Sequence, residues 1–509
     1  MIFTRFTNSY ISVIPSQVIK RKYTWHWTAR HLINDLAISN TYCVSFLFHG
    51  GFQMLQKFPI SKLTLALLAL PVASLSHAAG IDRSGQDIKG FFNDGTYAEI
   101  DYAYLKTDIS GHDHGGPYNI APTKEDYIKG EPTGNISEDA YSFMRYGVKT
   151  DVNDMISVGL FYDEPYGAEV RYEGESAFVA KEGIKTLANP SKGIAVDNEI
   201  INPNIDKDGY DKGTNVRLHT ESWTGLVGFK SSDGFQIYGG PVLQKAEAKV
   251  NLRGSAYGPL SGYDANVNHD TAWGWVAGVG YSKPEIALKA NLTYRSEIDH
   301  KTDVAEYIPL LQNPGLKGQF LDEVKIDRNS ELGKAIGPRA NTEAKVTTPA
   351  SVNFNFETGL SAKHQLLGTL DVRWVPWSDF SIVPPLYNAY SKGATKDNKG
   401  LPLLDYKDDQ WKVDVGLAKR FNEKLAGSVV VGWDSGAGDP VSSLGPVEGY
   451  YSIGGGVKYN VTPEWAVSLG GKYLKFGDAT GKLPNGSIVS KFEDNDGYIL
   501  GAKLSYHGK

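Results

Sequence analysis

The chain has 509 residues, a net charge of −6 and a single cysteine. An acidic chain is unsuited to nucleic acid, because phosphate binding requires clustered basic side chains. One cysteine cannot form an internal disulfide, and no stretch after residue 80 holds eighteen consecutive apolar residues, which excludes a membrane-spanning helix there.

Residues 54–78 have the pattern of a secretory signal peptide. Lys57 and Lys62 form its basic start, residues 63–72 its apolar core, and residues 76–78 a small-residue cleavage site. The apolar run is too short to span a membrane, although a buried helix is an alternative interpretation. We therefore predict that this segment is removed on export.

The residues before the signal peptide do not belong to the folded protein on this interpretation. A signal peptide stands at the start of a chain, so we interpret residues 1–53 as an over-extended leader and Met54 as the true start. Residues 1–78 hold seven Lys or Arg and one Asp, so cleavage after Ala78 leaves a net charge of −12. Cys43 lies in the leader, and we predict no disulfide and no thiol chemistry in the exported chain.

The remaining sequence repeats one pattern, a pair of alternating segments joined by a short polar turn. Such turns lie at 150–154, 231–234, 282–285, 361–365, 421–424 and 460–464. The connections between the pairs are much longer, at 107–138, 171–213, 253–269, 299–344, 380–408, 435–448 and 477–495. With a first strand near 97–106 and a last near 496–506, we predict about fourteen strands. Short turns on one side and long loops on the other are typical of a transmembrane up-and-down β-barrel, here residues 97–509.

The strand faces support an all-β barrel in lipid. Near 285–294 one face carries Ile286, Leu288, Ala290, Leu292 and Tyr294, and the other carries polar residues that include Asn291, Thr293 and Arg295. We expect the apolar face to meet lipid and the polar face to line the interior. Tryptophans gather toward strand ends, as interfacial aromatic girdles do: Trp273, Trp275, Trp374, Trp377, Trp411, Trp433 and Trp465. A water-soluble β core would explain the alternation but not the difference in loop length.

Several stretches resemble the FadL/OMPP1/TodX family of outer-membrane transporters. They are GTYAEIDYAYLKTDISG (95–111), NLTYRSEIDHK (291–301), TPASVNFNF (348–356) and VRWVPWSDF (372–380). The resemblance implies a fourteen-stranded barrel in the outer membrane of a Gram-negative bacterium, plugged by an N-terminal hatch. It also implies passive transport of long-chain fatty acids or aromatic hydrocarbons, with sideways release into the bilayer at a kink in the third strand.

The third predicted strand is interrupted by its own sequence. It begins at Met155 and meets Pro165, Tyr166 and Gly167 where its alternation should continue. Proline has no N–H for a ladder and glycine bends easily, so we predict a break that opens the wall. The alternative is that Pro165 ends the strand at the outer rim. The resemblance favours the functional kink.

The segment before the first strand is shorter than the family pattern. Only residues 79–96 remain after the signal peptide, and the family's Asn-Pro-Ala motif is absent. We predict a short plug there rather than a full hatch. Gly501, Leu504 and Tyr506 at the chain's end resemble the signal read by the barrel-assembly machinery, which we predict as a partner together with outer-membrane lipid and lipopolysaccharide.

An anionic ligand would need a cation inside the barrel. Arg295 is the first candidate, because arginine can hold a carboxylate with two hydrogen bonds. Arg373 has the same facing, with Asp371 as its expected neutralising partner, and Arg145 and Arg217 follow. For each arginine, a structural salt bridge is the alternative interpretation.

Residues 299–344 form an unusually apolar loop that includes Leu310, Leu311 and Phe320. Spacings of three and four suggest a short helix, and an apolar extracellular loop could capture hydrophobic ligands. Alternatively, these side chains pack the loop against residues 171–213. Both interpretations stay open at this point.

Other functions are less well supported by the sequence. A general diffusion porin for polar solutes is the main alternative, and an adhesin is a further one. His219, His269, His300 and His364 show no arrangement typical of a hydrolase, so we predict no enzymatic activity. His112-Asp113-His114 has no further metal ligands nearby, and we predict neither a metal nor a cofactor.

Overall fold

The computed structural model describes residues 81–508, except for 117–118, 138–139, 184, 190–193, 198–201, 203–204, 206–210, 324–326, 330–336, 393–394 and 396–398. The predicted leader and signal peptide, residues 1–53 and 54–78, lie outside these described residues. Within them, no helix is long and apolar enough to cross a membrane.

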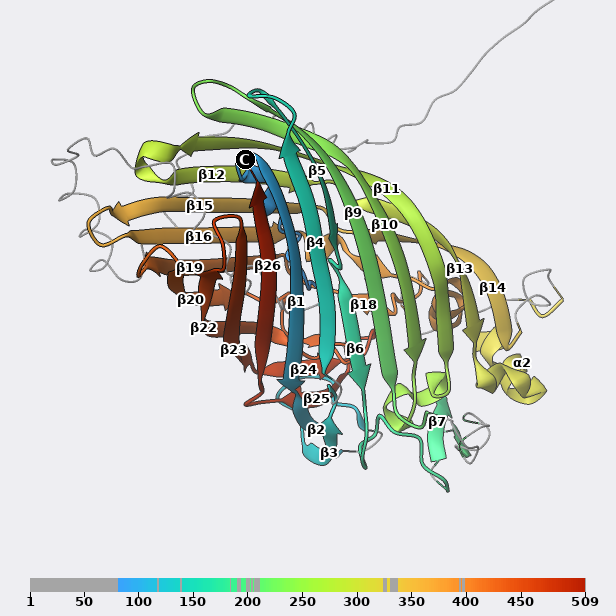
Figure 1. Cartoon of the computed structure of the whole chain (residues 1–509). Coiled ribbons are helices and arrows are strands. Elements are labelled where there is room, and N and C mark those ends of the chain that lie inside the picture. The colour runs from blue at the N-terminus through green and yellow to red at the C-terminus, as the bar shows by residue number, and fades with distance from the viewer. Residues whose placement is uncertain are drawn as a thin grey trace, which may run out of the picture. The chain divides into compact units, whose positions relative to one another are not determined.

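The described chain forms a closed antiparallel barrel (Figure 1). Its sheet contains seventeen strands, and β1 pairs with both β4 and the last strand, β26, which closes the ring. Three wall strands are interrupted and appear as the pairs β5 and β6, β12 and β13, and β14 and β15. The wall is therefore crossed fourteen times, which confirms the predicted fold.

The wall strands follow one another around the barrel mostly in chain order. They are β1 (Thr96–Asp108), β4 (Tyr141–Asp151), β5 (Ile156–Asp163), β6 (Gly167–Arg171), β9 (Asn215–Lys230), β10 (Phe235–Asn251), β11 (Asp264–Lys283), β12 (Leu288–Arg295), β13 (Ile298–Tyr307), β14 (Arg339–Thr348), β15 (Ser351–Ser361), β16 (Leu366–Val375), β19 (Gln410–Arg420), β20 (Leu425–Asp434), β22 (Glu448–Asn460), β23 (Trp465–Gly477) and β26 (Asp496–Gly508).

The outward face of the wall is apolar. On β20, the side chains of Val429 and Val431 are 60% and 54% exposed, whereas the intervening Val430 is buried. On β12, Leu292 and Tyr294 are exposed, and Asn291, Thr293 and Arg295 are buried, as predicted. A contiguous exposed apolar surface on a soluble protein would be unstable in water, so this surface indicates a wall that faces lipid.

Two sequence predictions about the wall need correction. Trp377 is not an interfacial residue, because it is fully buried and donates from Nε1 to Oε1 of Gln410 at 2.6 Å. Glu285 and Ile286 belong to a 3₁₀ turn, η6, rather than to a strand. Proline at position 284 starts this turn, and β12 begins only at Leu288.

The long loops carry additional structure at one end of the barrel (Figure 1). The accessory strands are β2 (Ser110–His114), β3 (Lys129–Asn135), β7 (Lys185–Asn189), β8 (Ile194–Asp197), β17 (Ser381–Ile382), β18 (Leu404–Asp405), β21 (Val441–Ser442), β24 (Ala479–Lys482) and β25 (Ile488–Phe492). The helices of these loops are η5 (Ser255–Leu260), η7 (Pro309–Gln312), α2 (Pro314–Glu323), η8 (Trp377–Asp379) and α4 (Pro385–Ser391). Two further helices lie elsewhere: η2 (Lys89–Phe92) precedes the first strand, and η6 (Pro284–Ile286) forms the turn between β11 and β12.

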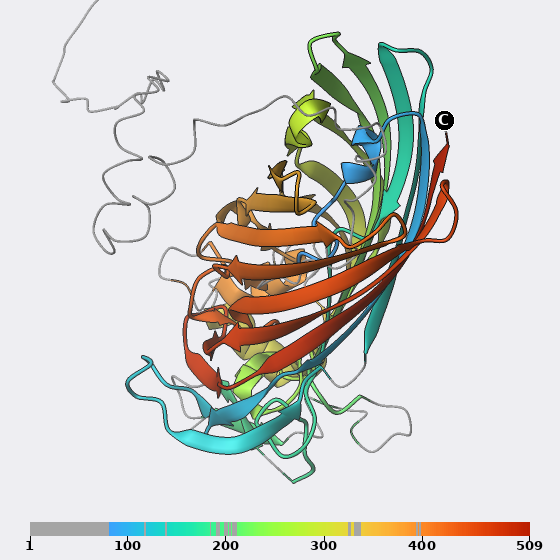
Figure 2. The same cartoon turned by 60° about the vertical axis from the view of Figure 1, so that its left-hand side comes forward.

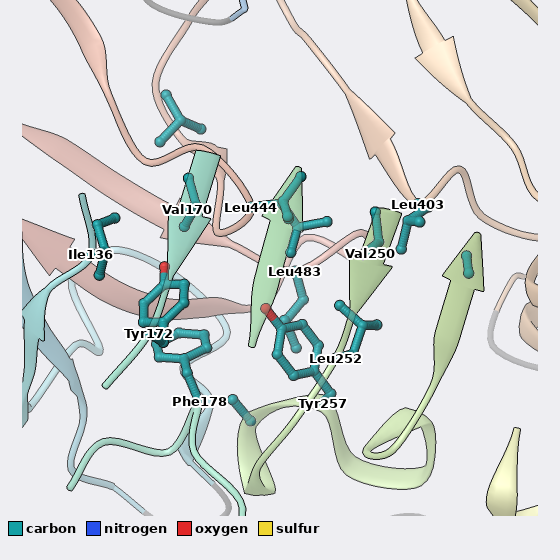
Figure 3. Close-up of a cluster of buried hydrophobic side chains, with 14 of the residues drawn as sticks. Ile136, Val170, Tyr172, Phe178, Val250, Leu252, Tyr257, Leu403, Leu444 and Leu483 are labelled. Atoms are coloured by element: carbon teal, nitrogen blue, oxygen red, sulfur yellow. The ribbon is translucent and has the colours of Figure 1, made fainter. Parts of the chain in front are cut away.

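The loops at that end share a hydrophobic core. Tyr172, Phe178 and Tyr257 converge with aliphatic side chains from several loops (Figure 3). The rings of Tyr172 and Phe178 stack with centroids 4.3 Å apart, and Tyr257 meets Phe178 edge-on at 5.9 Å. Burial of such large aromatic side chains holds the loops together. The loops therefore form one packed layer with a shared core.

Candidate functional site

The third wall strand is interrupted between Asp163 and Gly167 (Figure 1). β5 pairs with β9 as far as Asp163 opposite Ser222, and β6 resumes with Gly167 opposite His219. Four residue steps on the third strand therefore match three on β9, so the break holds one extra residue and is a β-bulge. The predicted residues Pro165, Tyr166 and Gly167 all lie at this break.

The neighbouring strand β4 loses its partner at the same level. Its ladder with β5 ends at the pair Tyr146 and Tyr162, yet β4 continues to Tyr141 and pairs there with β1. Among the described residues, β6 pairs only with β9. We call the interval between residues 141–145 of β4 and residues 164–167 the side opening.

A glutamate side chain satisfies part of this vacant strand edge. The backbone N–H of Met144 donates to the Glu164 carboxylate, and the hydroxyl of Tyr141 donates to Oε2 of Glu164 at 3.0 Å. Nδ1 of His219 lies 3.7 Å from the same oxygen. Since an unpaired backbone group in lipid costs several kcal/mol, the contact with the N–H of Met144 removes one such cost at the interrupted ladder.

The N-terminal segment, residues 81–94, lies within the ring of strands and meets the break from inside (Figure 2). Asp82 forms an antiparallel β-bridge with Tyr166. The N–H of Arg83 donates to the carbonyl of Pro165 at 2.7 Å, and the N–H of Gly167 donates to the carbonyl of Ile81 at 2.7 Å. The segment thus supplies the third strand with a partner on its inner side.

The same segment is held by the opposite wall. The guanidinium of Arg373 donates to both carboxylate oxygens of Asp82, at 2.5 and 3.2 Å. Nδ2 of Asn353 donates to the carbonyl of Gly85 at 2.8 Å, and the hydroxyl of Ser351 donates to Oε1 of Gln86 at 2.6 Å. These groups are buried, so residues 82–86 bridge the interior from the third strand to β15 and β16.

Charges extend this attachment along the segment. Nζ of Lys89 lies 2.7 Å from Asp371, and Arg145 lies 3.5 Å from Asp87. Burial favours the neutral form of Asp87, but the positive charges of Lys89 and Arg145 outweigh it and lower the pKa of Asp87 to about 2. Asp371 is therefore not the partner of Arg373, which corrects the sequence prediction.

Of the four predicted arginines, Arg217 is exposed on β9 and lies 2.6 Å from Glu169, and the other three are buried. Arg295 is 4% exposed, donates from NH1 to the hydroxyl of Thr224 at 2.9 Å, and leaves its Nε without a hydrogen bond among the described residues. Arg373 is occupied by the N-terminal segment. Arg145 lies 3.4 Å from Asp101. Unlike Arg145 and Arg373, Arg295 has no acidic side chain within ion-pair distance among the described residues, and ligand contact by any of them stays a prediction.

A small apolar cavity lies beside the break. Its volume is about 30 Å³, and its lining includes Ile81, Tyr166, Leu218, Val346, Phe380 and Ile382. Two of these side chains, Ile81 and Tyr166, flank the bridge between the N-terminal segment and the third strand. The space holds only a water molecule or two, so any larger occupant requires that one of these side chains moves.

The interior on the hairpin-turn side of the break is densely charged. Lys503 lies 2.7 Å from Glu99 and 3.3 Å from Asp101. Lys412 and Lys472 lie 3.1 and 3.0 Å from Asp414. All these side chains are buried in the barrel. An apolar molecule gains nothing by entering this region, because the paired charges would lose solvation or partners.

The loop residues predicted to capture ligand are mostly packed inside. Leu310 and Leu311 are each 2% exposed and belong to the hydrophobic core of the loops, which includes Tyr172 and Phe178 of the 171–213 loop. The predicted short helix is present as α2. Phe320 lies on α2, but its side chain is outside the described residues. The burial of Leu310 and Leu311 thus supports the interpretation that these side chains pack the loops together. Capture of ligand by this loop stays a prediction.

The candidate enzymatic and metal residues have structural partners. His300 contacts Asp270 and Gln244, each at 3.1 Å, rather than a hydroxyl nucleophile. Nδ1 of His114 accepts from the N–H of Ile128, and Asp113 accepts from two backbone N–H groups. In the part of the chain that the structure describes, no group of three side chains could hold a metal ion.

Sequence reasoning missed Asp82, Arg83, Tyr141 and Glu164. All four are charged or aromatic residues at the break, but they come from three segments that are adjacent only in the folded barrel. The stretch that holds Asp82 and Arg83 was recognised only as a short plug. A useful signal was present, since two ionisable residues before the first strand of a barrel require partners inside it.

These features define the class of protein, a membrane-embedded β-barrel with an interrupted wall. No family model matches the chain, and no curated protein matches it in sequence. Solved structures do match it. A Pseudomonas aeruginosa FadL homologue superimposes with a TM-score of 0.60 at 14% identity, covering 86% of this chain and 99% of that one.

A second solved structure has the same arrangement. It is a TodX mutant described as a monoaromatic hydrocarbon channel, with a TM-score of 0.51 at 10% identity, covering 86% of this chain and 98% of that one. At such low identity the likeness establishes the fold and not the cargo. The chain therefore has the fold of FadL-type outer-membrane barrels.

Proposed function

We propose that this protein is a passive transporter of hydrophobic molecules, which leave the barrel sideways through the side opening into the outer leaflet of the membrane. The observation that carries this proposal is the missing ladder between β4 and the third strand, next to the bulge at 163–167. A continuous wall would satisfy more backbone groups, so a break kept open in lipid favours a function for it.

The interior supports a sideways route rather than a straight one. Beyond the break, a ligand moving toward the hairpin-turn end would meet the ion pairs of Glu99, Asp101 and Asp414. Release into water would in addition cost about 0.8 kcal/mol per CH₂, or roughly 10 kcal/mol for a long acyl chain. Release into lipid avoids both costs, because the tail passes from one apolar medium to another.

Passage requires the N-terminal segment to move. The cavity beside the break has a volume of about 30 Å³, which is too small for a benzene ring or an acyl chain. Displacement of Ile81 from Tyr166 would join this cavity to the side opening. The N-terminal segment is therefore the plug in our proposal, held shut by Asp82 and by the backbone bonds to Pro165 and Gly167.

The cargo is a long-chain fatty acid or an aromatic hydrocarbon. Arg295 would hold an anionic head group through its free Nε, with Arg145 and Arg373 as weaker candidates because both have acidic partners. Capture by Leu310, Leu311 and Phe320 would require the loop core to loosen. Outer-membrane lipid and lipopolysaccharide would surround the wall, and the assembly machinery would insert it.

The test is uptake by cells that lack the gene and carry it on a plasmid. Labelled oleate and labelled toluene are compared for the natural protein and for a Pro165→Ala/Gly167→Val variant, which restores an N–H and stiffens the break. We expect uptake to fall several-fold. A matched control is Pro241→Ala/Gly225→Val, which changes the same residue types in the wall away from the break.

Two outcomes would contradict the proposal. Undiminished uptake by the Pro165→Ala/Gly167→Val variant would exclude the side opening as the exit. A large, steady ionic conductance of the purified protein in planar bilayers would instead favour the alternative, a diffusion porin for polar solutes.

A further inference from the structure

Arg83 is a buried cation whose side chain has no acidic or hydrogen-bonding partner among the described residues. Its side chain is 3% exposed, yet it forms neither a hydrogen bond nor an ion pair with any residue that the structure describes, and its NH1 is among the buried atoms that lack a partner. A buried guanidinium is normally paired, because its desolvation is costly. A merely structural role would be served better by an apolar side chain of similar volume.

The guanidinium lies in the side opening between Tyr141 and Gly167. Its central carbon lies 3.4 Å from the ring centroid of Tyr141, over the aromatic face. On the third strand it lies against Gly167, where a Cβ atom would come within 2.0 Å of that carbon. Glycine at 167 thus leaves room for the guanidinium in this position, between Tyr141 of β4 and the third strand.

The acidic groups around Arg83 attract it without binding it. Glu164 and Glu169 both act on it electrostatically, while Glu164 is engaged by Met144 and Tyr141 and Glu169 by Arg217 at 2.6 Å. Burial outweighs this attraction and lowers the pKa of Arg83 to about 9, so the side chain stays positive at neutral pH. The guanidinium is thus charged, and its NH1 has no hydrogen-bond acceptor among the described residues.

We propose that Arg83 is a binding site for the carboxylate of an amphiphilic cargo as it passes the side opening. The inference rests on the proposed function, and it makes long-chain monocarboxylates better ligands than neutral compounds of the same length. The guanidinium offers donors that match a carboxylate in two places. The apolar cavity lined by Ile81 and Tyr166 would take the start of the tail once Ile81 has moved away from Tyr166.

Arg83 differs from Arg145, Arg295 and Arg373 because it lies on the segment that closes the side opening in our proposal. Arg83 belongs to the plug and touches the exit, so a carboxylate bound to it would replace the contact with Tyr141 and loosen the segment from the wall. Head-group recognition and opening would then be the same event. A neutral hydrocarbon would have to displace the segment without this help.

The experiment measures ligand binding to purified protein in detergent at pH 8. Oleate and oleyl alcohol compete with a fluorescent fatty acid, so that only the head group differs between the two ligands. For Arg83→Gln we expect the affinity for oleate to fall roughly 10- to 100-fold, the effect of one charge-assisted contact, and the affinity for oleyl alcohol to stay unchanged. Arg420→Gln, at the hairpin-turn end of β19 and with an exposed side-chain contact to the carbonyl of Asn422, is the matched control.

A second variant moves the cation without removing it. Gly167→Ala places a methyl group against the guanidinium. We expect it to weaken the binding of oleate and to leave the binding of oleyl alcohol unchanged. Arg83→Lys keeps the charge and should recover part of the affinity. Heat-modified migration on gels verifies that each variant is folded, so that loss of structure is not mistaken for loss of the site.

The outcomes separate the inference from the proposed function. If Arg83→Gln lowered the affinities for oleate and oleyl alcohol equally, or lowered neither, the assignment of Arg83 would be overturned and the proposed hydrophobic transport would remain. Failure of the natural protein to bind both ligands would overturn the proposed function, and the site would fall with it.

Discussion

Asp82 joins two distant parts of the barrel through a single carboxylate and its backbone. Its side chain is fully buried against Arg373, and its backbone is bridged to Tyr166. A buried ion pair adds little net stability, but the loss of one partner strands the other charge in a dry site. Asp82 therefore controls where the N-terminal segment sits more than how stable the wall is.

We expect Asp82→Ala to loosen the start of the N-terminal segment, residues 81–86, while the wall stays folded. Stranding Arg373 costs about 3–5 kcal/mol, and the start of the segment is then held by neutral hydrogen bonds, whereas the ion pairs of Asp87 and Lys89 still hold its later residues. The measurement is limited trypsin digestion followed by intact mass, with new cleavage after Arg83. Asp94→Ala, whose side chain is 75% exposed, is the control, and an uncut Asp82→Ala protein would contradict the expectation.

At the scale of elements, the third strand and the N-terminal segment act as one unit. The pair Asp82 and Tyr166 is flanked by two backbone bonds of 2.7 Å, one from Arg83 and one from Gly167. Residues opposite each other in this way have their Cα atoms about 4.5 Å apart, a separation that a disulfide can bridge. The only natural cysteine, Cys43, lies outside the described residues.

We therefore expect an Asp82→Cys/Tyr166→Cys variant to lose uptake on oxidation and to regain it on reduction. The disulfide would fix the segment to the third strand and keep the cavity beside the break closed. Oleate uptake is measured before and after a reductant, and Asp82→Cys alone, treated identically, is the control. Full uptake by the oxidised protein would show that cargo does not need the segment to move.

At the scale of the whole molecule, the apolar outer face determines where the barrel is stable. Val429 lies in the middle of β20 and is 60% exposed on that face, whereas Val461 lies in a hairpin turn with 50% exposure. Both are exposed valines, but only the first is expected at the centre of the bilayer. The pair thus isolates the effect of depth.

We expect Val429→Arg to destabilise the folded barrel in lipid, with a free energy of unfolding that is lower by about 2–4 kcal/mol. For Val461→Arg we expect a decrease of at most about 1 kcal/mol. The cause is the transfer of a charge into the hydrocarbon interior. Urea unfolding in lipid vesicles, followed by tryptophan fluorescence, measures both values. Equal effects at the two positions would contradict a membrane centred on the strands.

Most of the wall was predictable from the sequence, because a barrel strand is a local pattern. Alternation on β12 and β20 and the polar turns between strands gave the correct count and facing. The exceptions have local causes: Pro284 begins a turn, and Trp377 sits beyond the end of β16 in a buried cluster. Neither effect is visible in period-two alternation alone.

The site was predictable only in part. Pro165 and Gly167 predict a break from their own chemistry, because proline lacks a backbone N–H and glycine lacks a side chain. Arg83 and Glu164 meet only after the N-terminal segment has entered the barrel. Burial of Leu310 and Leu311 likewise depends on loops far apart in the sequence, so apolar composition could not distinguish a surface for capture from a core.

The extra residue at the bulge has a consequence for everything that follows it on the third strand. Before the bulge, the odd-numbered Phe161 and Asp163 point inward; after it, the even-numbered Val170 and Tyr172 do. The insertion reverses the parity of the strand, but the pairing with β9 is the one that a regular ladder would have: without Glu164, Asp163 and Gly167 would be three steps apart and would still lie opposite Ser222 and His219. A deletion of Glu164 alone would therefore remove the bulge and leave Val170 facing inward and Arg171 outward, so that a single residue separates an interrupted third strand from a continuous one.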